Sequence, residues 1–208
     1  MTTANLNPPA AGQSKTEGHD DRTRTTAQET ISANDTNAAD TYTARMAHQT
    51  AALALNAVFT STPAADVARL AADADERDFP TAQHWHIFTA AAEQARTLTA
   101  AGNGTLIVAA ETVSAALQAR GQLNDTARTV ILDAVAGCRA GRALAPTAAA
   151  DALQALKRWR WQQAARAVSD QARTAAETGS DADAVRLLHY AAHLTTLARR
   201  AGVVMHDA

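Results

Sequence analysis

The stretch from Asp78 to Ala100, DFPTAQHWHIFTAAAEQARTLTA, decides the fold of this chain. Thr81 is a residue type that caps the start of a helix, and apolar residues follow it at spacings of three and four, as on one helical face. Gly102-Asn103-Gly104 comes directly afterwards, and both residue types tolerate the positive φ with which helices end. The stretch therefore predicts one helix that begins after Thr81 and buries a single face.

The composition extends this helical prediction to the rest of the chain. The protein has 208 residues and a net charge of −2. Alanine, which loses no side-chain entropy in a helix, makes up about a quarter of the residues. No alternating apolar pattern of useful length predicts a strand. We expect an all-α protein, with a small helical-bundle head followed by a long antiparallel helical hairpin.

Working outward from the opening stretch, the chain divides into four predicted regions. Residues 1–43 are polar and have few large aliphatic side chains to offset chain entropy, so we expect a disordered N-terminal tail. Residues 44–141 are expected to form a five-helix head, and residues 142–202 the hairpin. A short tail, 203–208, ends the sequence.

The two helices of the predicted hairpin have apolar faces that need a further helix to bury them. Gly179 is expected to end its first helix, and Ser180 with Asp183 predicts a capping box for the second. Two helices of this size cannot hide both apolar faces from water by themselves, so we expect a homo-oligomer that forms through the hairpin. The side chains expected at this interface are Trp159, Trp161, Leu187, Tyr190 and Leu194.

The order of residues from Asp78 to Leu123 resembles the N-terminal domain of the bacterial replicative DNA helicase, the DnaB-like hexamer that works with primase. The matching residues are Asp78-Phe79, His84, Ile87-Phe88, Thr112-Val113, Leu117, Gly121 and Leu123. The chain departs from the family at Ala109, where an acidic residue is usual, and at Asn124-Asp125-Thr126, where a Gly-Gly turn is usual.

This resemblance implies a fold, a function and a set of partners. It implies that Phe79, His84, Ile87 and Phe88 hold the head together, with His84 in a structural role. It also implies a replication-associated protein that acts through protein–protein contacts with a replicative helicase, a primase or a helicase loader.

The sequence carries no recognisable catalytic or cofactor motif. A phosphate-binding loop needs the form G-x-x-x-x-G-K-[S/T], and the segment 137–142, GCRAGR, lacks the Lys and the hydroxyl. His189 and His193 have the i, i+4 spacing of two metal ligands, but the third ligand is missing nearby, which favours a solvated polar face. We expect no enzyme activity, no cofactor and no resident metal, and no unwinding by this chain alone.

Two alternatives remain open. The cluster Lys157, Arg158 and Arg160, interleaved with tryptophans, is typical of contacts to phosphates and bases, and would suit a helical DNA-binding regulator. Helical periodicity explains the tryptophans without DNA, so direct DNA binding is not the favoured interpretation. The other alternative is a relic, or a phage- or plasmid-type modulator that occupies the hairpin sites of a helicase ring.

The expected compartment is the cytoplasm. The single Cys138 excludes an internal disulfide and suits a reducing environment, where it is expected to be a small buried side chain. We find no apolar run long enough for a membrane span and no secretory signal at the N-terminus, so no membrane contact is expected.

Overall fold

The computed structural model describes residues 41–136 and 144–203. Within these ranges every regular element is a helix, apart from an isolated antiparallel β-bridge between Pro63 and Ile107. The predicted all-α class is confirmed. Most of the two predicted tails, and Cys138 with the segment 137–143, lie outside the described residues. The described residues from Thr43 onward belong to one compact unit.

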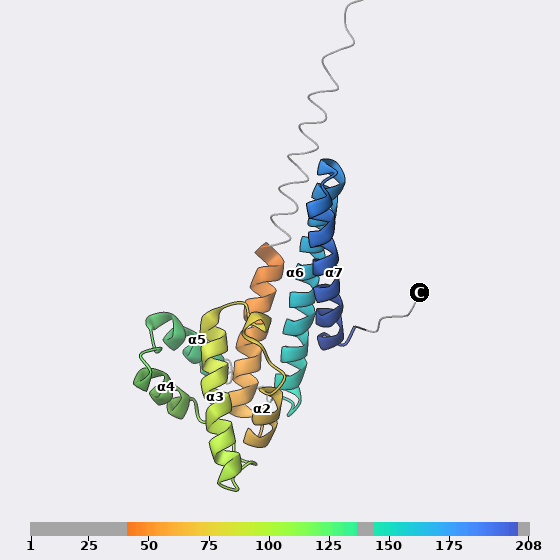
Figure 1. Cartoon of the computed structure of the whole chain (residues 1–208). Coiled ribbons are helices and arrows are strands. Elements are labelled where there is room, and N and C mark those ends of the chain that lie inside the picture. The colour runs from red at the N-terminus through yellow and green to blue at the C-terminus, as the bar shows by residue number, and fades with distance from the viewer. Residues whose placement is uncertain (1–40, 137–143, 204–208) are drawn as a thin grey trace, which may run out of the picture. The chain divides into compact units, whose positions relative to one another are not determined.

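In its described residues the head consists of α-helices, which Figure 1 shows packed together. The first covers 41–60 in the described chain. The others are α2 (Ala64–Leu70), α3 (Ala82–Ala100), α4 (Ala110–Ala119) and α5 (Asp125–Ala136). Helix α3, which comes from the opening stretch of the sequence, lies in the middle and packs against α2, α4 and α5.

Helix α3 begins and ends where its sequence predicts. The Thr81 side chain accepts a hydrogen bond from the backbone N–H of His84, which satisfies one of the free donors of the first turn. Gly102 follows the last turn with φ of 79°, in the left-handed region that glycine adopts without strain. Helix α5 also begins with a side-chain cap, because the Asn124 Oδ1 atom accepts a hydrogen bond from the N–H of Ala127 at 2.8 Å.

The core of the head is built from a few large side chains and many alanines. Ile87 and Phe88 of α3 are fully buried, as are Leu55 of the first helix and Leu117 of α4. Alanines between them let the helices approach closely. The buried amide of Asn56 adds a polar tie, since its Nδ2 atom donates to the carbonyl of Ala134 at 2.6 Å and so joins the first helix to α5.

A short 3₁₀-helix, η1 (Glu76–Asp78), precedes α3 and was not predicted. Asp75 caps it, and the capping is reciprocal. The Asp75 side chain accepts from the N–H of Arg77 at 2.9 Å, and Asp78 Oδ2 accepts from the N–H of Asp75 at 3.0 Å. This box fixes the direction in which the Asp78 carboxylate points.

The last two helices are α6 (Ala148–Thr178) and α7 (Asp181–Arg200), which pack against each other and run antiparallel (Figure 1). Gly179 joins them with φ of 60°, as predicted for a helix end. The predicted capping box at Ser180 is wrong, because the Ser180 side chain makes no capping bond. The Asp183 carboxylate instead accepts from Thr178 and pairs with Arg186, both at 3.0 Å.

Candidate functional site

The four residues expected to hold the head together are all buried. Phe79 and His84 are 6% and 5% exposed, and Ile87 and Phe88 are fully inaccessible. The rings of Phe79 and Phe88 lie 5.2 Å apart, and the ring of Trp85 lies 5.6 Å from that of Phe79. These residues therefore form an aromatic corner where η1 meets α3, and they are not available to a partner.

His84 takes part in the start of α3 as a neutral base. The hydroxyl of Thr81 accepts from the backbone N–H of His84 and lies 2.6 Å from its Nδ1 atom. A hydroxyl that accepts from the N–H is free to donate to an unprotonated Nδ1. Burial, with a smaller effect of His48 whose ring lies 5.6 Å away, lowers the pKa of His84 to about 4. The geometry makes His84 a structural residue at neutral pH.

The five residues expected at the hairpin interface lie in different environments. Trp159 packs against the core of the head, and its Nε1 atom is buried without a hydrogen-bond partner in the described part of the chain. Trp161, Leu187 and Leu194 are half-buried. Tyr190 is the one exposed member, at 45%. The structure thus assigns Trp159 to the base of the hairpin rather than to its free surface.

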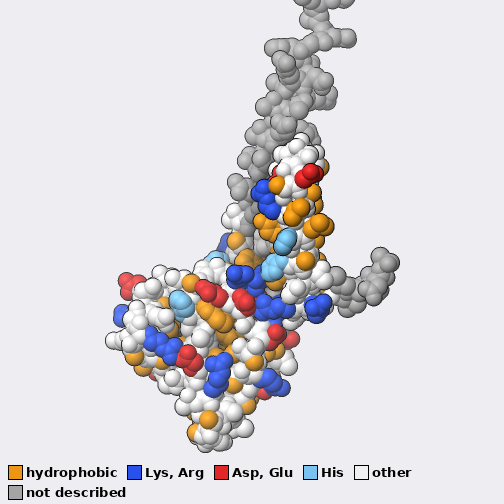
Figure 2. Space-filling model, viewed as in Figure 1, with side chains coloured by type: hydrophobic (Ala, Val, Ile, Leu, Met, Phe, Trp, Pro, Cys, Tyr) orange, Lys and Arg blue, Asp and Glu red, His pale blue; other side chains and the backbone are white. Residues whose placement is uncertain are grey.

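Two exposed apolar residues on α7 escaped the sequence analysis. Leu188 is 71% exposed and Val185, one turn before it, is 57% exposed. Both lie on a different face of α7 from Leu187 and Leu194, as their positions along a helix require. Figure 2 shows hydrophobic side chains along this part of the hairpin. The sequence feature that could have identified Val185 and Leu188 is their spacing of three residues, which places them on one helical face, away from Leu187 and Leu194.

The three cations proposed as nucleic-acid contacts are mostly engaged within the protein. Lys157 is 8% exposed and pairs with Asp73. Arg160 has a side chain that is 12% exposed, and its Nη1 atom lies 3.0 Å from Asp78 Oδ1. Arg158 remains exposed, with its Nε atom 3.4 Å from the carbonyl of Ala201. Two of the three charges are neutralised inside the fold, which weakens the case for a phosphate-binding surface here.

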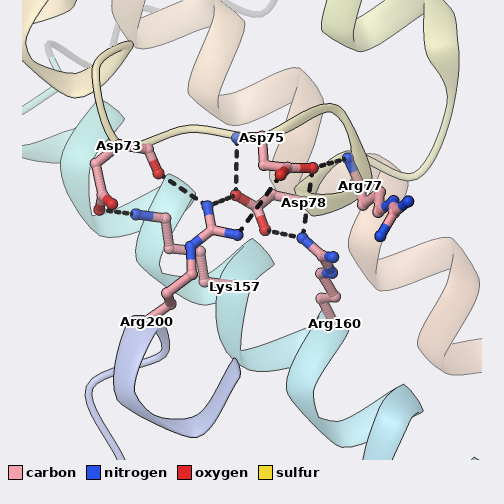
Figure 3. A network of polar contacts seen from close by, with 7 residues as sticks. All are labelled: Asp73, Asp75, Arg77, Asp78, Lys157, Arg160 and Arg200. Atoms are coloured by element: carbon pink, nitrogen blue, oxygen red, sulfur yellow. Dashed lines mark hydrogen bonds and ion pairs between the residues drawn. The ribbon is translucent and has the colours of Figure 1, made fainter. Parts of the chain in front are cut away.

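These ion pairs belong to a larger network that joins the head to the hairpin (Figure 3). We call it the joint. It consists of three carboxylates from the segment between α2 and α3 and three cations from the hairpin: Asp73, Asp75, Asp78, Lys157, Arg160 and Arg200.

Asp78 is the centre of the joint. The residue is 1% exposed, and both of its carboxylate oxygens are occupied. Oδ1 accepts from Arg160 of α6 at 3.0 Å, and Oδ2 accepts from Arg200 of α7 at 2.8 Å. A carboxylate buried to this extent is tolerated only with such charged donors, because its desolvation is otherwise too unfavourable.

The rest of the joint completes the charge balance. Arg200 also donates to the backbone carbonyl of Asp73 at 2.9 Å. The Arg77 N–H lowers the pKa of Asp75, and the nearby Arg160 and Arg200 lower it further against the opposing effect of burial. Figure 3 shows the Arg77 side chain pointing away from the network. Three negative and three positive side chains therefore meet where the hairpin leaves the head.

Sequence reasoning found parts of this joint but not the joint itself. Asp78 was named for the resemblance, and Lys157 and Arg160 for DNA contacts. Arg200 was missed because it lies more than a hundred positions from Asp78, and sequence spacing contains no information about such a contact. The sequence feature that could have indicated the joint is the run of closely spaced aspartates before α3, together with the cations on the predicted hairpin.

Two further features of the described residues concern metal binding and membranes. In 41–136 and 144–203, no three metal-ligating side chains come together, and His189 is exposed. None of the helices in this part of the chain has the length and apolar character needed to cross a membrane. No family model matches the chain, and no curated protein or solved structure is similar enough to it to count as a match.

Proposed function

We propose that this chain is a non-enzymatic assembly protein, in which a closed helical head carries a hairpin that docks on other helices. The observation that carries the proposal is the exposure of large apolar side chains on α7. Leu188 and Val185 are more than half exposed and lie on one face of α7, and Tyr190 is 45% exposed on another face. Apolar side chains gathered on one projecting element are typical of protein–protein contacts.

The hairpin offers a simple way to bury these side chains. Two antiparallel hairpins that pack together form a four-helix bundle, in which each supplies the partner that the other lacks. The occupant that we propose is a second copy of this hairpin or a hairpin of the same kind on a partner protein. The charged residues along α7, such as Arg186 and Asp183, would remain at the rim of such a contact.

The resemblance of residues 78–123 supports a more specific proposal. The partner would be a replicative helicase, or the primase or loader that works with it. Burial of Phe79, His84, Ile87 and Phe88 is compatible with this resemblance, since the family expectation gives these residues structural roles. The choice of partner rests on the matching residues from Asp78 to Leu123.

Sedimentation of the full chain tests the docking surface. At tens of micromolar, the unmodified protein should sediment as a dimer or larger, and Leu188→Glu should shift it to the monomer. Leu132→Glu is the matched control, because Leu132 on α5 is 67% exposed and Leu188 is 71% exposed. A monomeric starting protein, or equal effects of the two variants, would contradict self-association through α7.

A second experiment tests the partner. The protein would be mixed with purified replicative helicase, primase or loader from the source organism, and co-sedimentation would be measured with and without Leu188→Glu. Loss of binding in that variant, with Leu132→Glu unaffected, supports hairpin docking. Unwinding rates with added protein then show whether it assists or blocks the helicase. Absence of binding to all three proteins would overturn the replication proposal.

A further inference from the structure

The hairpin is attached to the head in two physically different ways. The first turns of α6 are held by apolar contacts: Ala149, Leu153 and Leu156 are 4% exposed or less and belong to the core of the head. Farther along, where α6 leaves the head, Trp159 still packs against this core, and the next residue, Arg160, is bound to a carboxylate. The apolar contacts of the first turns do not depend on charge. The ion pair between Arg160 and Asp78, in contrast, is lost when the Asp78 carboxylate loses its charge.

Helix α7 reaches the head through a charged side chain. Arg200 is its last residue, and its guanidinium bonds both Asp78 Oδ2 and the carbonyl of Asp73. The buried residues of α7 are Leu197 and Ala198, and α7 packs along α6. Arg200 therefore gives α7 a polar attachment to the head in addition to its packing along α6.

Asp78 combines the two attachments. One carboxylate accepts from Arg160 on α6 and from Arg200 on α7, with an oxygen for each. Its own orientation is fixed by the η1 capping box, through the N–H of Asp75. Hydrogen bonds between charged groups are directional, so this arrangement holds both helices at one angle to the segment that carries Asp78.

We propose that Asp78 is a latch that sets the direction of the hairpin relative to the head. With the latch closed, the two arginines hold both helices at a fixed angle. With the carboxylate neutralised, α6 stays seated through Leu153 and Leu156, and the hairpin changes its direction without detaching. The latch acts within one chain, so it does not depend on the proposed partner or on self-association.

The experiment measures the distance distribution between spin labels at Ala100→Cys, at the end of α3, and Ala176→Cys, near the far end of α6. Both positions are exposed, and the native Cys138 is replaced by Ser in this background. The samples are dilute, or mixed with excess unlabelled protein, so that only distances within a chain are recorded. Helicity and the thermal midpoint are measured on each sample.

The informative variants are Asp78→Asn, which removes the charge at nearly constant shape, and Arg200→Gln, which removes one of its partners. Arg186→Gln is the matched control, because Arg186 is on the same helix but pairs with Asp183 within the hairpin. We expect a narrow distribution for the starting protein and for the control. We expect a distribution at least about twice as broad, or a shifted mean, in Asp78→Asn and Arg200→Gln, with helicity retained.

Each other outcome counts against the latch. Unchanged distributions in folded Asp78→Asn and Arg200→Gln would show that apolar contacts alone set the hairpin direction. If Asp78→Asn loses helicity, Arg200→Gln decides, since Arg200 is at the end of a helix and a quarter exposed. Equal broadening in Arg186→Gln would attribute the motion to the hairpin itself rather than to the joint.

Discussion

The head and the hairpin use similar amphipathic helices in opposite ways. Helix α3 in the head is covered by three neighbouring helices, and its large apolar residues Ile87 and Phe88 are inaccessible. Helix α7 in the hairpin has α6 as its main neighbour, and Leu188 and Val185 remain exposed. The large apolar residues of α3 thus stabilise the core of the head, whereas Leu188 and Val185 of α7 are free for docking.

The largest expected effect is on the head core. Phe88→Ala should lower the free energy of unfolding by about 3–5 kcal/mol, because it leaves a cavity among buried side chains. Leu188→Ala, at an exposed site of the hairpin, should change the stability of the monomer by less than about 0.5 kcal/mol. Urea unfolding at low protein concentration measures both. Equal losses would break the comparison, since Leu188 would then be part of a core.

The next largest effect on stability distinguishes the buried ion pairs of the joint from an exposed ion pair on the surface. Asp78→Ala leaves two arginines without their central carboxylate, and we expect a loss of about 3 kcal/mol, at the lower end for buried pairs because Arg200 is partly exposed. Asp170→Ala removes an exposed pair with Arg173 and should change the stability by less than about 0.5 kcal/mol. A loss below about 1 kcal/mol for Asp78→Ala would show that the joint is a surface network.

A smaller effect concerns pH and lies in the head alone. The pKa of His84 is lowered to about 4 in the folded protein, whereas the unfolded chain takes up the proton near 6.5. Stability from this group is therefore complete above about pH 6.5 and is lost as the pH falls toward 4. We expect about 1–2 kcal/mol of this loss, after allowance for solvent screening.

Unfolding in urea at pH 7 and pH 5 measures this contribution. The decrease between the two values should be smaller in His84→Gln than in the starting protein. His189→Gln is the matched control, because it removes an exposed imidazole of the hairpin rather than a buried one of the head. An identical pH dependence in all three proteins would exclude His84 as the source.

The smallest expected effect is confined to the hairpin turn. Gly179 has φ of 60°, so Gly179→Ala places a Cβ atom in the left-handed region and should destabilise the hairpin by about 1 kcal/mol. Hydrogen exchange should increase near residues 176–184 while α3 keeps its protection. Equal increases in α3 would indicate that head and hairpin unfold as one unit.

The sequence was sufficient for the local part of this structure. Thr81, Asn124 and Gly179 mark helix ends by their own backbone chemistry, so the helices were predictable from short stretches. The capping box at Ser180 failed because Thr178 and Arg186 compete for the Asp183 carboxylate. Such a competition depends on side-chain geometry that a spacing rule does not contain.

The joint was beyond the reach of the sequence for a different reason. Lys157 and Arg160 look like a basic surface cluster when α6 is considered alone. Their aspartate partners lie more than eighty positions earlier in the chain, and Arg200 is brought in only when α7 folds back along α6. Trp159 was assigned to the hairpin interface for the same reason, although it packs on the head.

Hydrogen exchange of the full chain at low and high protein concentration tests the contrast between head and hairpin most directly. If α7 is a docking surface and the head is closed, protection should rise with concentration in residues 181–194 and stay constant in α3, residues 82–100. Protection of α7 that does not depend on concentration, or that rises equally in α3, would contradict the proposal that the hairpin is the surface through which this protein associates.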